Sequence, residues 1–142
     1  MKVNLEQVLN DADGQPRQNI DVKKDEQQLP TKDVRGNLVL ENKGPLKLKD
    51  VLFLSVNAVY NEPDGRPERV GYAEALIRGK LARRIKRGGE LSLGAEEVKL
   101  ILDLATKRYS ADPELIVTLT ELIDPDNKEL KDKEDAKQET SA

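Results

Sequence analysis

The apolar run VLFLSVNAVY at residues 51–60 constrains the fold of this chain more than any other segment. Eight of its ten residues are apolar, and Phe53 is the only phenylalanine in the chain. At 100° per residue the apolar side chains surround the axis, interrupted only by Ser55 and Asn57. A helix that is apolar on all sides has to be covered by other elements on several sides. The run is therefore expected to form the core of a globular domain.

A buried strand is the alternative for this segment, because periodicity alone does not type a short apolar run. Asp50, directly before the run, favours a helix, since an aspartate serves there as a cap or as an acid in the first turn.

The composition points to one domain with an unpacked part. A chain of 142 residues normally forms a single domain. Hydrophobic residues make up 37% and charged residues 36%, against about 45–50% and about 25% in typical domains. One Phe, three Tyr and no Trp leave the core to aliphatic side chains. With a net charge of −3, no bulk attraction to nucleic acid or membrane is expected.

Two missing residue types exclude several kinds of chemistry. Without cysteine there are no disulfides, thiolate nucleophiles or zinc–sulfur sites. Without histidine the commonest general base and the commonest metal ligand are absent. The N-terminus lacks an apolar signal-peptide core, and no run reaches membrane-spanning length. We expect a soluble protein that stays where it is made.

Residues 1–49 read as strands and loops. Apolar residues at 3–9 precede the Asp-Gly turn of residues 11–16, and this order predicts a hairpin whose second strand covers residues 19–23. Residues 23–33 are polar and contain Pro30, so they predict a solvated loop. Residues 37–41 and 45–49 alternate apolar and polar side chains around Asn42-Lys43-Gly44, which predicts a second hairpin.

Three more helices are expected after the proline-rich turn at residues 61–67. The first spans 68–87, with Val70, Ala73, Ile77, Leu81 and Ile85 on its apolar side and Gly88-Gly89 at its end. The second spans about 95–109, and its apolar residues follow helical spacing. The third starts at Asp112-Pro113-Glu114, a favourable cap sequence, and stops at Asp124-Pro125.

The chain from residue 126 onward is strongly charged. Leu130 is its only large apolar side chain, so this segment cannot offset its own ordering entropy and is expected to be disordered. The domain prediction is one α+β domain at 1–125, with a β and loop portion at 1–49 and a helical portion at 50–125, followed by a tail at 126–142.

The helix at 68–87 carries a candidate binding surface. Six cations fall within ten residues, at positions 78, 80, 83, 84, 86 and 87. We predict a partner-binding site made of Tyr72, Leu76, Lys80, Arg83, Lys86 and Arg87. In the functional interpretation, Tyr72 and Leu76 are apolar anchors among cations that dock an acidic protein or phosphates. In the alternative interpretation, this is a solvated helix face whose long side chains cover a neighbour. No aromatic residues interleave with the cations as stacking platforms would, so protein is favoured over nucleic acid.

Other candidate sites are weak. Asp11, Asp13 and Gly14 resemble the start of a calcium loop, but the full twelve-residue pattern is missing. Glu96 and Glu97 are adjacent, so they point to different faces and cannot act as a paired acid and base. Gly88-Gly89 lacks the spacing of a phosphate-binding loop. We therefore expect no enzyme activity, no metal and no cofactor.

Four segments carry a resemblance: VLNDADGQP, LKLKDVLFLSVNAVY, ELSLGAEEVKLILDLATKRY and DPELIVTLTELID. In this order they resemble a group of small uncharacterised proteins encoded by tailed bacteriophages. The resemblance covers most of residues 1–124, whereas the insert at 17–45 and the charged tail depart from the compact members. It implies a phage origin and a bacterial host, and it supplies no catalytic residues to carry over.

Together these observations predict an α+β fold in which small N-terminal antiparallel hairpins pack on a bundle of about four helices, followed by a disordered charged tail. The expected function is a non-catalytic protein-binding factor of a phage, either a virion or assembly component or a protein that binds and modulates a host protein. The alternative is a nucleic-acid-binding regulator that uses the basic helix at 78–87. The expected location is the host cytoplasm or the virion, with no membrane association.

Overall fold

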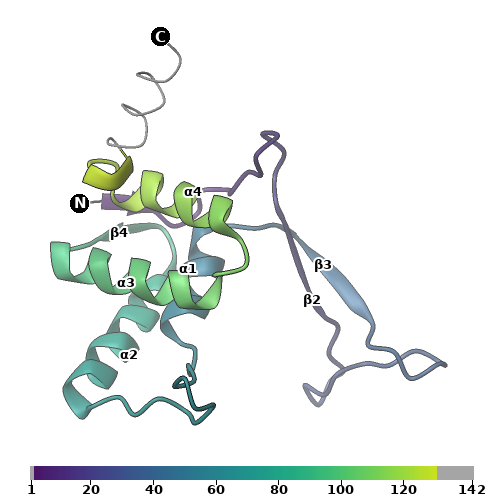
Figure 1. Ribbon diagram of the computed structural model, residues 1–142. Coiled ribbons are helices and arrows are strands. Elements are labelled where there is room, and N and C mark those ends of the chain that lie inside the picture. Colours follow the sequence, from purple (N-terminus) through teal and green to yellow (C-terminus); the bar gives the residue numbers. More distant parts are fainter. Residues whose placement is uncertain (1, 131–142) are drawn as a thin grey trace.

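The computed structural model describes residues 2–130, which form a helical body and a long arm that extends from it (Figure 1). The fold is α+β, as the sequence predicts. The elements follow in the order β1 (Lys2–Asn4), β2 (Gln18–Val22), β3 (Leu40–Pro45), α1 (Leu48–Val56), α2 (Tyr72–Arg87), β4 (Glu90–Ser92), α3 (Ala95–Arg108) and α4 (Pro113–Ile123).

A two-stranded antiparallel sheet, β1 with β4, covers one side of the body, and Val3 lies opposite Leu91. The sequence-based prediction that the first strand pairs with residues 19–23 is wrong. Gly88 and Gly89, both with a φ of 75°, turn the chain sharply after α2. Because glycine adopts this left-handed conformation without a steric penalty, the pair delivers β4 beside β1.

The central apolar run forms α1, as predicted, but the helix starts earlier and ends earlier than residues 51–60. The Asp50 carboxylate accepts a hydrogen bond from the Lys47 backbone N–H at 3.0 Å, so Lys47 caps the helix and Leu48 begins it. Val51, Leu52 and Val56 are fully buried. Leu54 is 45% exposed, so one side of α1 is not covered by the body.

The three later helices form where they are predicted, with one changed boundary. Asp112 caps α4 by accepting a hydrogen bond from the Leu115 N–H at 3.2 Å. The helix predicted at 68–87 is α2, and it starts at Tyr72 and not at Glu68. Glu68 belongs to the preceding turn, because its N–H donates to the Tyr60 carbonyl at 2.7 Å and its carboxylate pairs with Arg78 at 2.6 Å.

One hydrophobic core joins the sheet and the four helices. The α1 helix packs against α2 and α3, and α4 packs against α3 and β1. The fully buried large side chains are all aliphatic, and they are Leu5, Leu9, Leu48, Val51, Leu52, Leu81, Ile85, Ile101, Leu104, Leu119 and Ile123. The predicted aliphatic core is confirmed.

The arm is built on a second antiparallel pair, β2 with β3, in which Ile20 lies opposite Asn42 and Val22 opposite Leu40. The predicted hairpin of residues 37–41 with residues 45–49 is wrong. Leu48 and Lys49 are already helical, so residues 45–49 are divided between the end of β3 and the start of α1. The strand at 19–23 forms nearly as predicted, but it has a different partner.

A turn closed by a hydrogen bond between residues eight positions apart occurs four times in residues 2–130. In each copy the N–H of the last residue donates to the carbonyl eight residues earlier, over 2.7–2.9 Å. These closing pairs are Arg17 with Leu9, Thr31 with Lys23, Val39 with Thr31, and Glu68 with Tyr60. In the first three copies an aspartate, Asp11, Asp25 or Asp33, accepts two backbone N–H groups with its carboxylate. The predicted loop at 23–33 therefore contains one whole turn and the start of another.

Two rings of three residues, each ring joined by backbone hydrogen bonds, include the ends of the first three of these turns. Leu9, Arg17 and Leu46 form a ring of backbone hydrogen bonds of 2.7–2.9 Å at the base of the arm. A second ring of the same kind, made by Lys23, Thr31 and Val39, lies at the far end, where the arm divides into two small turns. Hydrogen bonds of the backbone thus hold the arm together without a core of its own.

The described chain continues past α4 through Leu130, and residues 128–130 begin a helical turn. Of the tail predicted at 126–142, residues 131–142 lie outside the described residues.

Candidate protein-binding surface

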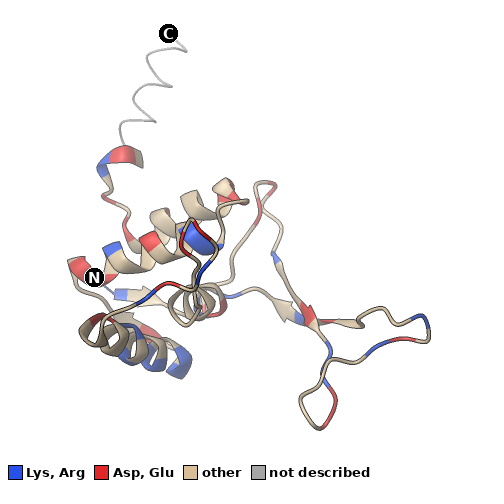
Figure 2. Cartoon of the chain, turned by 60° about the horizontal axis from the view of Figure 1, so that its bottom comes forward, with Lys and Arg blue, Asp and Glu red and all other residues tan. Residues whose placement is uncertain are grey.

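Five of the six predicted site residues lie on the outer side of α2. Tyr72, Leu76, Lys80, Arg83 and Arg87 follow one another at spacings of three and four, so they line one face of the helix. We call these five residues the basic stripe. The buried residues Leu81 and Ile85 lie on the opposite face. Figure 2 shows the cations of α2 in blue along the helix.

Two of the six cations of α2 hold the body together. Arg78 donates to Glu68 at 2.6 Å and lies 3.5 Å from Glu74, and both Arg78 and Glu68 are nearly buried. Arg84 pairs with Glu97 at 2.6 Å and also donates to the Ser92 carbonyl. These two arginines clamp α2 to its neighbours, so they are not available to a partner.

Lys86, a predicted site residue, turns away from the basic stripe. Its ammonium lies 5.7 Å from the centre of the Phe53 ring of α1, within the range of a cation–π contact. By contrast, Lys80, Arg83 and Arg87 make no ion pair with any residue between 2 and 130. The stripe therefore offers three outward cations.

The first half of α2 exposes apolar side chains. Tyr72 is 82% exposed and Leu76 is 43% exposed, so neither is packed under the N-terminal sheet. Ile77 is 49% exposed, although the sequence predicts it on the buried side. Since α1 has only nine residues, the body covers only the second half of α2, where Leu81, Ala82 and Ile85 are buried. Ile77 thus lies exposed in the first half of α2, on the side of the helix that carries Leu81.

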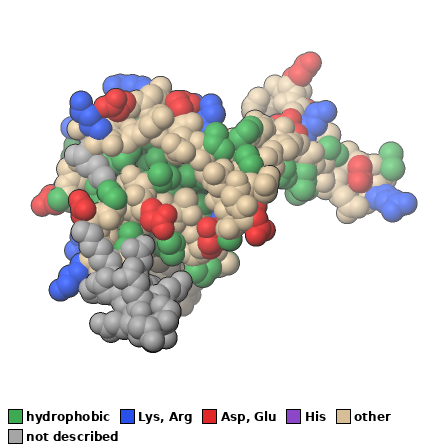
Figure 3. Space-filling model, turned by 90° about the horizontal axis from the view of Figure 1, so that it is seen from above, with side chains coloured by type: hydrophobic (Ala, Val, Ile, Leu, Met, Phe, Trp, Pro, Cys, Tyr) green, Lys and Arg blue, Asp and Glu red, His purple; other side chains and the backbone are tan. Residues whose placement is uncertain are grey.

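The arm presents a second exposed apolar surface. Ile20, Val22 and Leu40 share one face of the β2–β3 ribbon, because directly opposed residues in antiparallel strands point the same way. The other face carries Asn19, Asp21 and Lys43, which line a cleft toward the body. Figure 3 shows apolar side chains exposed along the arm. Sequence reasoning did not single out this surface.

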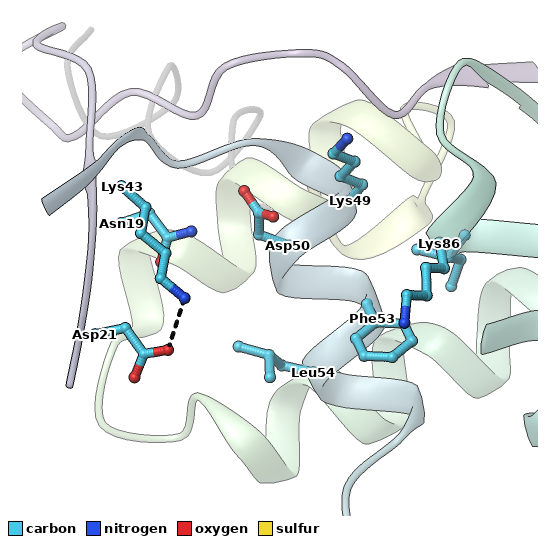
Figure 4. A pocket seen from close by; sticks show the side chains of 9 residues that line it. Asn19, Asp21, Lys43, Lys49, Asp50, Phe53, Leu54 and Lys86 are labelled. Atoms are coloured by element: carbon cyan, nitrogen blue, oxygen red, sulfur yellow. Dashed lines mark hydrogen bonds and ion pairs between the residues drawn. The ribbon is translucent and has the colours of Figure 1, made fainter. Parts of the chain in front are cut away.

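The cleft between the arm and the body measures about 330 Å³. Phe53 and Leu54 of α1 form its apolar wall, and Lys86 of α2 borders it (Figure 4). Its charged groups are largely paired, since Lys43 binds Asp21 at 3.2 Å. The cleft therefore combines an apolar wall with charged groups at its edge.

The groups whose pKa is shifted serve the fold. Hydrogen bonds from Lys47 and from the Gly89 N–H lower the pKa of Glu6 to about 2. Burial raises the pKa of Tyr60, whose hydroxyl lies 2.5 Å from the Ser55 carbonyl and 3.0 Å from the Leu104 carbonyl. Within residues 2–130, no three acidic, histidine or cysteine side chains gather in a way that could hold a metal ion.

Comparison with known proteins gives no relative: the chain matches no family model, no curated protein and no solved structure. The functional interpretation therefore depends on the surface itself. Of the helices in the described part of the chain, none has the length and apolar character needed to cross a bilayer.

Proposed function

We propose that the protein is a non-catalytic protein-binding factor that docks its partner on the basic stripe of α2. The observation that carries the proposal is the combination of exposed Tyr72 and Leu76 with outward Lys80, Arg83 and Arg87 on a single helix face. Tyrosine and arginine are among the residue types most enriched in interaction hot spots, and Tyr72, Arg83 and Arg87 supply both types on this face. The proposal includes the phage context that the resemblance implies, as a virion or assembly component or a factor that binds a host protein.

The charge of this surface sets the chemistry of the partner. Three outward cations without internal acids favour a partner that presents carboxylates around an apolar centre. The exposed apolar end of α2 favours protein over nucleic acid, because phosphate backbones offer nothing for Leu76 and Ile77 to bury.

A matched pair of variants tests the proposal. Arg83→Glu/Arg87→Glu reverses two cations of the basic stripe, and Lys24→Glu/Lys99→Glu makes the same charge change at exposed positions elsewhere. Each immobilised protein is used to capture partners from a nuclease-treated bacterial lysate, and the captured protein is then purified and titrated. We expect the stripe variant to lose at least about 10-fold in affinity and the control to retain it, with circular dichroism showing that both are folded.

Two outcomes would contradict the proposal. Equal binding by both variants would reduce the stripe to a solvated helix face. Binding of a short DNA duplex that weakens steeply as salt rises, and that is lost in the stripe variant, would favour the nucleic-acid-binding alternative, since each phosphate contact releases counterions.

A further inference from the structure

A second helix carries a surface of opposite charge. The outer face of α4 presents Val117 and Glu121, and Asp124 follows directly as the C-cap residue, whereas Leu115, Leu119 and Ile123 lie on the buried face of the helix. We call Val117, Glu121 and Asp124 the acidic stripe. Val117 is 42% exposed, Glu121 is exposed, and Asp124 is half-buried. Glu121 forms no ion pair with any residue of the described chain, and the Asp124 carboxylate accepts only from the Asn127 amide, at 3.0 Å.

The two stripes are opposite in charge, because the basic stripe carries Lys80, Arg83 and Arg87 and the acidic stripe carries Glu121 and Asp124. The α2 helix has six cations and one acid, so its net charge is +5. The α4 helix has two acids, Glu114 and Glu121, and no cation, and Asp112 and Asp124 flank it as its cap residues. The Arg17 guanidinium pairs with both Asp112 and Glu114, so Glu121 and Asp124 are the acids that remain for the acidic stripe.

The stripes also match in spacing. Leu76, Lys80 and Arg83 are separated by four and then three residues, and so are Val117, Glu121 and Asp124. When the two helices lie side by side and run in the same direction, Val117 meets Leu76 and Glu121 meets Lys80, and Asp124, which follows the end of α4, lies near the level of Arg83. Each helix offers a face one side chain wide, about 24 Å long for α2 and about 16 Å for α4.

These stripes cannot meet within one molecule. Figure 1 shows α2 and α4 at opposite ends of the body, with α1 and α3 between them. We propose, on the basis of the function proposed above, that the partner of the basic stripe is the acidic stripe of a second copy of this chain. Because the two contacting surfaces differ, the interface is heterologous, and copies add head to tail into a ring or a filament.

Charge exchange between two variants tests this pairing. Lys80→Glu/Arg83→Glu makes α2 acidic, and Glu121→Lys/Asp124→Lys makes α4 basic. Sedimentation velocity between about 10 μM and 1 mM protein should show association of the unmodified chain at about 50 mM salt, weakening at about 500 mM salt, where charges are screened. Each variant alone should be monomeric, because like charges then face each other.

An equimolar mixture of the two variants should associate again, since the acidic α2 of one then faces the basic α4 of the other and their unmodified stripes also match. This recovery also shows that both variants are folded. A mixture that stays monomeric would overturn the inference, and so would an unmodified chain that is monomeric at 1 mM. If the lysate experiment still shows capture of another protein through the basic stripe, the proposed function stands while the self-association fails.

Discussion

At the scale of single residues, Glu6 joins three segments that are far apart in the chain. Its carboxylate lies 3.0 Å from the Lys47 ammonium, 3.3 Å from the Lys49 ammonium and 3.3 Å from the Gly89 N–H. It also fills the space beside Gly88, where an added Cβ would come within 2.5 Å of the Glu6 carboxylate. The φ of 75° favours glycine at position 88, and a Cβ there would also displace the Glu6 carboxylate from its present position. Nothing in the local sequence around Glu6 indicates these contacts.

The pKa of Glu6 predicts a pH dependence of stability. Because its pKa is lowered from 4.5 to about 2 by Lys47 first and then by Gly89, the folded state binds a proton less readily than the unfolded state. The resulting stabilisation is fully present above pH 4.5 and is lost as the pH falls toward 2. We expect Glu6→Gln to be less stable than the parent protein at pH 7 and to approach it as the pH falls through this window.

The measurement is urea unfolding of the two proteins between pH 7 and pH 2. The pKa values of Asp21 and Glu68 are also lowered, so the difference between parent and variant is the informative quantity. Glu62→Gln, at an exposed turn position, serves as the matched control. A constant difference between the parent and Glu6→Gln at every pH would show that the Glu6 charge contributes nothing.

At the scale of elements, helices were predictable from the sequence and strand pairing was not. Caps such as Asp112-Pro113 and endings such as Gly88-Gly89 are local signals, so they place helices without knowledge of the rest of the fold. The Asp-Gly turn at 11–16 also forms, but the strand after it pairs with β3, about twenty residues further on. The missed signal is the eight-residue spacing of the turns, which accounts for the whole end of the arm.

The features of the candidate surface also divide into those that the sequence predicts and those that it does not. The outward positions of Lys80, Arg83 and Arg87 follow from helical periodicity alone. The exposure of Ile77 and the internal roles of Arg78 and Arg84 depend on which elements lie beside α2 and how long they are. These are properties of the tertiary structure, so the sequence pattern of one helix does not contain them.

The repeated turn makes Gln28 an informative position. Three copies of the turn have a glycine five residues after the residue whose carbonyl closes the turn. These glycines are Gly14, Gly36 and Gly65, with φ between 80° and 86°. The remaining copy has Gln28, with a φ of 64°. Because a residue with a Cβ is disfavoured in this conformation, Gln28→Gly should strengthen the turn by about 0.5–1 kcal/mol, which is roughly two- to fivefold in amide protection.

Hydrogen exchange at the Leu29 and Thr31 amides, which close this turn, measures the effect. Gln28→Ala is the control, since it keeps a Cβ at the same φ and should give no gain. Equal protection in the glycine variant and the parent would show that the turn gains nothing from relief of this backbone conformation.

At the scale of the whole molecule, the arm and the body differ in what holds them together. No residue between 10 and 47 belongs to the buried core. Five of the eleven exposed large apolar side chains in the described chain lie on the arm: Ile20, Leu29, Val34, Leu38 and Leu40. The arm therefore exposes apolar side chains and contributes no buried side chain to the core of the body.

Removal of the arm tests this separation. Leu46 donates its N–H to the Arg17 carbonyl at 2.7 Å, so the two residues are already placed as the ends of a two-residue turn. Replacing residues 18–45 by Asn-Gly should therefore close the body without strain. Because no buried core residue is lost, we expect the melting temperature to change by less than about 4 °C, equivalent to about 1 kcal/mol or less.

Thermal unfolding followed by circular dichroism measures this, and sedimentation shows whether the shortened chain still associates through α2 and α4. A fall of more than about 10 °C, or a loss of cooperative unfolding, would show that the arm stabilises the body, and its exposed apolar face would then need no partner to explain it.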